Sequence, residues 1–284
     1  MEGYIMRSIA GQSVAQMGGR GSVLARQKRD HIRLDSLLHR LAEVSPNQQG
    51  SVLLDIYRLV FPHAFAEEAV LWPVMRRVLP DGHALTLQVE VEHQQINELV
   101  TRLESLPPGS EDRRQVLDRI VRLLREDVRD EEDKLLPRLQ AKLTAGQLRL
   151  LGWAWELVRF IAPTRAHPIV SRRPPGNLLS ALPHALLDRC RDLVDDRLHR
   201  RPDAAAVPLL SSVSISLTRA SHTVERLPGM KSGEDPATRV ARGNGLGRGA
   251  LLVIAAASAG MILLSRRRRP AGGPKRQPPA SPIV

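Results

Sequence analysis

The apolar positions of the chain recur at spacings of three and four residues through residues 22 to 160, which is the period of helices that bury one face. Breaks in this pattern delimit four long helices, expected at residues 22–44, 51–72, 82–105 and from 110 onward. A capping motif that begins at Thr144 starts a fifth helix, which runs to residue 162. The pattern predicts an all-α protein, an antiparallel four-helix bundle with an extra helix.

Single residues refine these helices. Ser110 is a suitable N-cap for the fourth helix. Pro62 interrupts the second helix and is expected to kink it or to restart it just before His63, because proline has no backbone N–H. Trp153 and Trp155 of the fifth helix are expected to pack that helix on the bundle.

Two motifs of the chain occur twice. The stretch "HAFAEEAVLWP" at residues 63–73 returns 64 positions later as "DVRDEEDKLLP" at residues 127–137, with the paired glutamates and the final proline in register. In the same way "HIRLDSLL", which begins at His31, aligns with "HQQINELV", which begins at His93. The simplest structure for this doubled pattern is a pair of similar helical hairpins that face each other.

Each of the four helices brings at least one ionisable group to its apolar stripe, and residues four apart share a face. The candidate metal ligands are His31, His63, Glu67, His93, Asp127 and Glu131. One such residue is best explained by packing, but burying unpaired carboxylates costs several kcal/mol each, and metal cations offset that cost. Imidazole and carboxylate ligands without sulfur suit iron or manganese, with zinc as an alternative. By contrast, four histidines lack a partner at metal-ligand spacing and are expected at the surface: His83, His184, His199 and His222.

Over residues 25 to 141 the sequence resembles the hemerythrin family in its broad bacterial form, chiefly through its two Glu-Glu motifs. This resemblance implies a non-haem di-iron centre in which Glu67 and Glu131 bridge the two iron ions and the three histidines complete the ligand set. The stretch "PTRAHPIVSRRPPGN" at residues 163–177 is similar to the extension found after this domain in actinobacterial members.

Asp127 departs from the family pattern, which has histidine at this position. Either the aspartate replaces the imidazole directly or a water molecule fills the gap. The resemblance implies a protein that binds or senses dioxygen or iron, with dioxygen or a related small oxidant as its partner. Two alternatives stay open: a metal-free or degenerate helical scaffold for protein partners, and a di-iron enzyme that handles peroxide or nitric oxide. Enzymatic activity is therefore undecided, and a metal-binding role is favoured.

Charge divides the chain. Residues 26 to 158 carry 19 Lys and Arg against 21 Asp and Glu, a net charge of −2, whereas residues 159 to 284 carry 21 against 8, a net charge of +13. The lone Cys190 excludes an internal disulfide and a thiolate metal cluster. Nucleic acid is not expected as a partner, because the basic region lacks interleaved aromatic residues.

The expected organisation is a flexible leader (1–21), the bundle with its fifth helix (22–162), a largely disordered linker with a short helix (163–248), a transmembrane helix (249–265) and a basic tail (266–284).

The membrane expectation rests on "GALLVIAAASAGMILLS" at residues 249–265, which holds no charge and is followed by four arginines. We expect a single-pass membrane protein with the bundle in the cytoplasm, because residues 1–21 do not have the pattern of a secretory signal. The arginines favour the opposite orientation.

Overall fold

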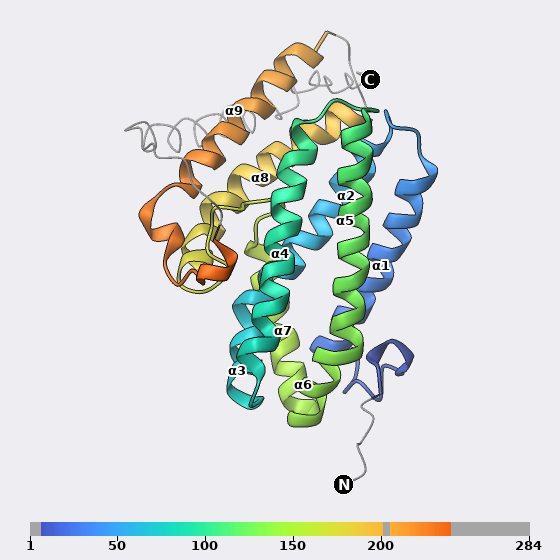
Figure 1. Ribbon diagram of the computed structural model, residues 1–284, viewed down its shortest axis with the longest axis vertical. Coiled ribbons are helices and arrows are strands. Elements are labelled where there is room, and N and C mark those ends of the chain that lie inside the picture. The colour runs from blue at the N-terminus through green and yellow to red at the C-terminus, as the bar shows by residue number, and fades with distance from the viewer. Residues whose placement is uncertain (1–6, 201–204, 240–284) are drawn as a thin grey trace, which may run out of the picture. The chain divides into compact units, whose positions relative to one another are not determined.

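The computed structural model describes residues 7–200 and 205–239, which lie within one compact unit, Met1–Leu246. Every regular element in these two ranges is helical (Figure 1). The all-α prediction is therefore confirmed for the part of the chain that the structure describes.

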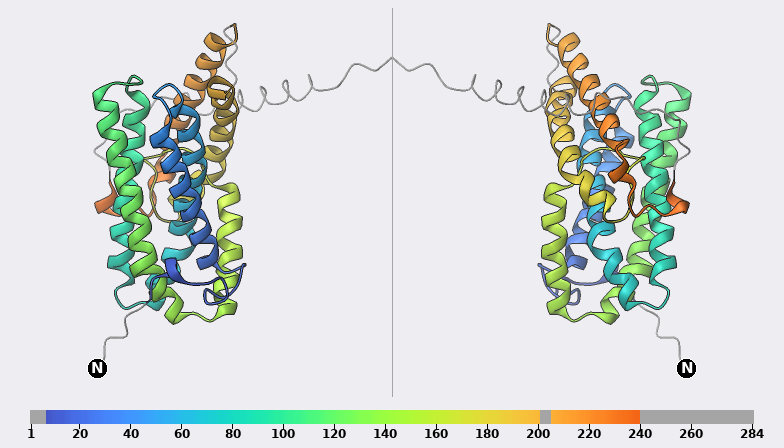
Figure 2. Two further views of the ribbon diagram at one scale, coloured as in Figure 1. Left: turned by 90° about the vertical axis from the view of Figure 1, so that its right-hand side faces the viewer. Right: turned by 90° about the vertical axis from the view of Figure 1, so that its left-hand side faces the viewer.

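Four helical rods run alternately up and down to form the bundle (Figure 1). They are α1 (Val23–Glu43); α2 (Gln49–Ala66) with α3 (Trp72–Val78); α4 (Gly82–Ser105); and α5 (Glu111–Asp130) with α6 (Leu136–Lys142). Helix α1 packs on α2, and α4 packs on α5, so each hairpin of the doubled motif is a pair of neighbours. Figure 2 shows the two pairs facing each other.

The helix boundaries follow the local signals in the sequence. The Ser110 hydroxyl accepts the backbone N–H of Arg113 at 3.3 Å, as an N-cap does. Thr144 and Gln147 form a reciprocal capping box at the start of α7 (Ala145–Ile161). At Pro62 the expectation of a restart is wrong, because α2 continues through this residue.

Both Glu-Glu motifs form π-helical turns, η2 (Glu67–Leu71) and η3 (Glu131–Leu135). In η2 the N–H of Trp72 bonds to the carbonyl of Glu67, five residues earlier, and the N–H of Leu136 does the same to Glu131 in η3. A proline follows each turn, and a proline inside a regular α-helix clashes with the carbonyl four residues before it. The wider turn accommodates the proline, so the second rod of each hairpin stays continuous through the motif.

The ionisable groups separate two apolar cores along the bundle. On α1, Leu24 belongs to one apolar core, here called the lower core, and Leu34 belongs to the other, the upper core, with His31 between them in the sequence. Helix α4 repeats this order, with Val89 below and Ile96 above its own histidine. The candidate ligands therefore form one polar layer enclosed by apolar packing at both ends.

Helix α7 packs against α1 and α2 as a fifth helix, as expected. Its two tryptophans behave differently: Trp155 is 0% exposed and packs in the lower core, whereas Trp153 is 70% exposed. The expectation that both would pack on the bundle is therefore right for Trp155 alone. They lie two residues apart, which places them on different sides of a helix.

The linker expected at 163–248 is folded wherever the structure describes it. It forms two long helices, α8 (Gly176–Arg200) and α9 (Val207–Glu225), and α8 packs on α2. Buried ion pairs explain why this charged segment is ordered: the Arg165 guanidinium contacts Asp192 at 2.7 Å and Asp195 at 2.9 Å. The expectation of disorder was wrong here because it assumed that these charged side chains are exposed to water. The leader is also partly packed, since Ile9 and Met17 are buried in the lower core.

The expectation of a membrane protein requires correction. Within residues 7–200 and 205–239 the helices are too short or too polar to cross a bilayer. The apolar segment 249–265, on which the expectation rested, and the tail 266–284 lie outside the described residues. The described part of the chain therefore does not support the expected transmembrane helix or the expected membrane location.

Candidate metal centre

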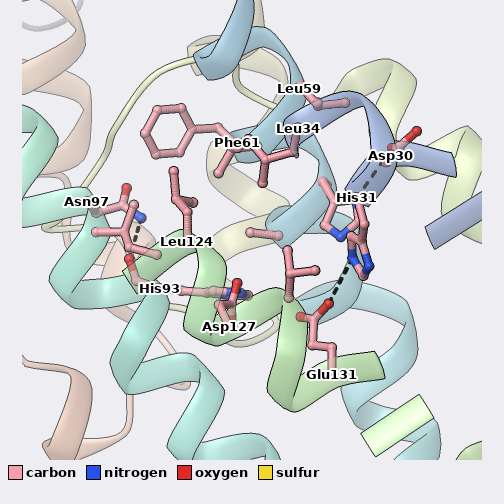
Figure 3. A pocket seen from close by; sticks show the side chains of 15 residues that line it. Asp30, His31, Leu34, Leu59, Phe61, His93, Asn97, Leu124, Asp127 and Glu131 are labelled. Carbon is pink, nitrogen blue, oxygen red and sulfur yellow. Dashed lines mark hydrogen bonds and ion pairs between the residues drawn. The ribbon is translucent and has the colours of Figure 1, made fainter. Parts of the chain in front are cut away.

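The fold brings all six candidate ligands into the polar layer of the bundle, and Figure 3 shows His31, His93, Asp127 and Glu131 among them. They come from four rods: His31 of α1, His63 and Glu67 of the α2 rod, His93 of α4, and Asp127 and Glu131 of the α5 rod. Five of the residues are buried, and the His63 side chain is 12% exposed. The structure thus brings together the residues that the sequence pattern selected, and their role as metal ligands stays a prediction.

The histidines turn their Nε2 atoms towards the two inner glutamates. His31 Nε2 lies 3.1 Å from Glu131 Oε2, His63 Nε2 lies 3.1 Å from Glu67 Oε1, and His93 Nε2 lies 3.7 Å from Glu67 Oε2. Two groups have ligand atoms within 4.8 Å of one another: His31, His63 and Glu131, and Glu67, His93 and Glu131. Because Glu131 belongs to both groups, the layer has room for two ions that share a carboxylate.

Each histidine also turns its Nδ1 atom towards a second, outer carboxylate. The pairs are His31–Glu132 at 2.9 Å, His63–Asp30 at 3.4 Å and His93–Glu68 at 3.0 Å. An imidazole that donates its Nδ1–H in this way presents the Nε2 lone pair to a metal, and such outer carboxylates orient metal-binding histidines. The sequence analysis missed these three acids, although two of them are the second glutamates of the repeated motifs.

Several buried atoms of the layer lack a hydrogen-bond partner within the described part of the chain. They are His31 Nε2, Glu67 Oε2, Asp127 Oδ1 and Glu131 Oε1. Leaving a buried polar atom unpaired costs about 1–3 kcal/mol, and more for a charged group. All four are atoms of the kind that ligate metals. The donor set therefore fits a pair of cations.

The pKa shifts of the layer also indicate that its buried carboxylates are stabilised by positive charge. Burial alone would lower the pKa of His63, but Glu67 and Asp30 outweigh it and raise that pKa to about 9. Burial alone would raise the pKa of Glu67. The neighbouring His63, His93 and His31 together outweigh burial and lower that pKa to about 2. Burial and the neighbouring Glu67 and Asp127 raise the pKa of Glu131 well above its usual range. The carboxylates repel one another unless a cation lies between them.

Asp127 lies beside His93 and belongs to neither of the two groups of ligand atoms. Its Oδ2 is 3.6 Å from His93 Nε2. Burial alone would lower the pKa of His93, but Asp127 and Glu68 outweigh it and raise that pKa well above its usual range. Asp127 is thus close enough to His93 for both side chains to contact one bound cation.

A small cavity of about 30 Å³ adjoins the layer. Its polar lining includes Asp127, Glu131 and the three histidines, and its apolar lining includes Leu34, Leu59, Phe61 and Leu124, most of which are labelled in Figure 3. On this measure a cavity needs roughly 10–15 Å³ to hold one water molecule. The cavity therefore suits a ligand of two or three atoms.

The fold and the site together define a metal-binding four-helix bundle. Residues 22–139 match the family model described as Hemerythrin HHE cation binding domain, so this part of the chain is similar to that domain. A hemerythrin-like protein of Schizosaccharomyces pombe, itself uncharacterised, is 24% identical over 134 residues. That match covers 47% of this chain and 66% of the yeast protein, just under two thirds of its length. No solved structure matches the chain.

Proposed function

We propose that the bundle holds a non-haem di-iron centre and that the protein uses this centre to bind dioxygen or a related small oxidant. The observation that carries the proposal is the pair of buried ligand groups that share Glu131 within the region that is similar to an HHE domain. Iron is favoured over softer metals because the ligands are imidazoles and carboxylates. Bound iron would supply the capacity to bind or reduce the small oxidant.

In this proposal His31, His63 and Glu131 hold one ion, and Glu67, His93 and Glu131 hold the other. The outer carboxylates keep the imidazole rings in the binding orientation. The apolar wall of the cavity limits access of water to the centre and leaves space for a small ligand.

Metal analysis of the full chain tests the proposal. After anaerobic reconstitution with ferrous iron we expect two iron ions per chain, and exposure to dioxygen should change the optical spectrum. A chain that retains fewer than one iron ion would contradict the proposal. Reconstitution with manganese and zinc in parallel distinguishes an iron site from a site for another metal.

We further propose that Asp127 is a ligand of the ion next to His93. Asp127→Ala is then expected to weaken iron binding nearly as much as loss of an inner glutamate, because a charged ligand is removed. Asp127→His should keep both ions and shift the spectrum towards that of a histidine-rich centre. Asp118→Ala, at an exposed position of the same helix, is the matched control. Unchanged affinity and spectrum in Asp127→Ala would show that this aspartate is not a ligand.

A further inference from the structure

A second cluster of ligand-type side chains lies outside the di-metal layer. His167 is in the loop after α7, His184 is on α8, and Glu225 ends α9. All three are buried, and their ligand-type atoms lie within 4.8 Å of one another. The prediction that His184 is a surface residue is therefore wrong: its side chain is fully enclosed between the two helices that the sequence analysis did not expect to pack.

His167 is held in one orientation by a carboxylate. Its Nε2 lies 3.0 Å from Asp188 Oδ2, which also accepts the backbone N–H groups of Thr164 (2.9 Å) and Arg165 (3.0 Å). Asp188 is thus fixed as a hydrogen-bond acceptor, and His167 Nε2–H donates to it. The other nitrogen, Nδ1, then faces Glu225 Oε1 at 3.0 Å. Two acceptor atoms meet at this distance only if a proton or a metal ion lies between them.

His184 presents a lone pair to the same place. Its Nδ1–H donates to the carbonyl of Ser180 at 3.0 Å, which leaves Nε2 as the acceptor nitrogen. That Nε2 atom is buried without a hydrogen-bond partner among the residues described, and so are Glu225 Oε2 and the Ser221 hydroxyl. Ser221 lies four residues before Glu225 and shares its face of α9.

A proton alone does not satisfy these atoms. Protonated His167 would pair with Glu225 Oε1 but would leave His184 Nε2 and Glu225 Oε2 without partners. The two imidazole rings lie 4.0 Å apart between centroids at an angle of 32°, so they cannot both carry a positive charge without strong repulsion. A divalent cation supplies charge and ligation to all three side chains at once.

We propose that His167, His184 and Glu225 bind a divalent transition-metal ion at a second site. Two imidazoles and one carboxylate are a ligand set that zinc accepts, with a fourth position left for water. Nitrogen and oxygen ligands of one tetrahedral zinc ion lie about 3.3 Å from one another. The pair His167 Nδ1 and Glu225 Oε1 is already near this spacing, and a ligand-type atom of His184 lies within 4.8 Å of the other two residues' ligand-type atoms.

An ion at this second site would join α8, α9 and the loop that contains His167. A chain of hydrogen bonds connects this loop to the bundle. The backbone N–H of His167 donates to Asn97 Oδ1 at 3.0 Å, and Asn97 Nδ2 donates to the carbonyl of His93 at 2.8 Å. Asn97 also lines the cavity beside the di-metal layer. The two sites are therefore separate but joined through one asparagine.

Zinc titration of the full chain tests the second site. The background variant is Glu67→Ala/Glu131→Ala, which disables the di-metal layer. In this background we expect added His184→Asn to remove one equivalent of tightly bound zinc, measured by equilibrium dialysis and metal analysis, whereas His199→Asn, at an exposed position of α8, removes none. Equal zinc content in the His184→Asn and His199→Asn chains would overturn the proposal.

Hydrogen exchange gives a second readout in case His184→Asn does not fold. In the background variant, zinc is expected to slow amide exchange in residues 176–200 and 207–225, because the ion joins these helices. Addition of chelator should reverse the effect. Exchange in both helices that is indifferent to zinc would overturn the proposal, whatever the behaviour of the substituted chain.

Discussion

Glu131→Ala is expected to remove both iron ions from the protein. Glu131 contributes to both groups of ligand atoms, whereas each histidine contributes to one. Its loss deletes a charged ligand from two sites at once, so iron content after anaerobic reconstitution should fall from two ions per chain to below one. Iron analysis of the desalted protein measures this directly.

Two variants on the same rod serve as comparisons for Glu131→Ala. Glu126→Ala changes an exposed residue of α5 and is expected to leave iron content unchanged. Glu132→Gln alters only the outer contact to His31 Nδ1, so metal affinity should fall by about 10–100-fold without loss of the site. If Glu131→Ala retains both ions at the affinity of the natural chain, Glu131 is not a shared ligand.

Removal of metal is expected to lower the stability of the bundle by a large amount. A ligand present at about a thousand times its dissociation constant adds roughly 4 kcal/mol to the free energy of unfolding. For a chain of this size that corresponds to a decrease in Tm of about 8–16 °C when the metal is removed. The cause is the set of buried, inward-facing ligand atoms, which lose their counter-charge together.

Thermal unfolding followed by circular dichroism, with iron and then with excess chelator, measures this effect. The Glu67→Ala/Glu131→Ala chain is the control, because it no longer binds metal in the layer and its Tm should be insensitive to iron. A natural chain whose Tm is also indifferent to iron and chelator would favour the alternative of a metal-free helical scaffold.

Local information in the sequence was sufficient to predict the helices of the bundle. The three- and four-residue periodicity placed its helices, and caps such as Ser110 and Thr144 act within a single turn, so they operate before any tertiary contact forms. The repeated motifs placed six ionisable groups on apolar stripes, and antiparallel packing then brings those groups to one level of the bundle. The similarity to the HHE domain was recognisable for the same reason, because the signature of that domain is contained in short contiguous motifs.

The orientation of the side chains was decided by tertiary structure. Sequence alone does not state which glutamate of a Glu-Glu pair faces inward. Packing directs Glu67 towards two histidine Nε2 atoms and Glu68 towards the Nδ1 atom of His93. The role of a carboxylate as metal ligand or as orienting partner depends on atoms from another helix, and these are distant in the sequence.

The segment after the bundle shows what the sequence determined and what only the tertiary structure decided. The sequence identified residues 159–284 as strongly basic, but charge has opposite consequences in water and in a buried pair. The pairing of Arg165 with Asp192 joins residues 27 positions apart and exists only when α8 is already packed. The enclosure of His184 likewise depends on α9 covering α8. Within the bundle the sequence determined where helices form and which polar groups they carry, but it did not predict α9 (Val207–Glu225). Tertiary packing decided which polar groups leave water, because burial depends on contacts between distant parts of the chain.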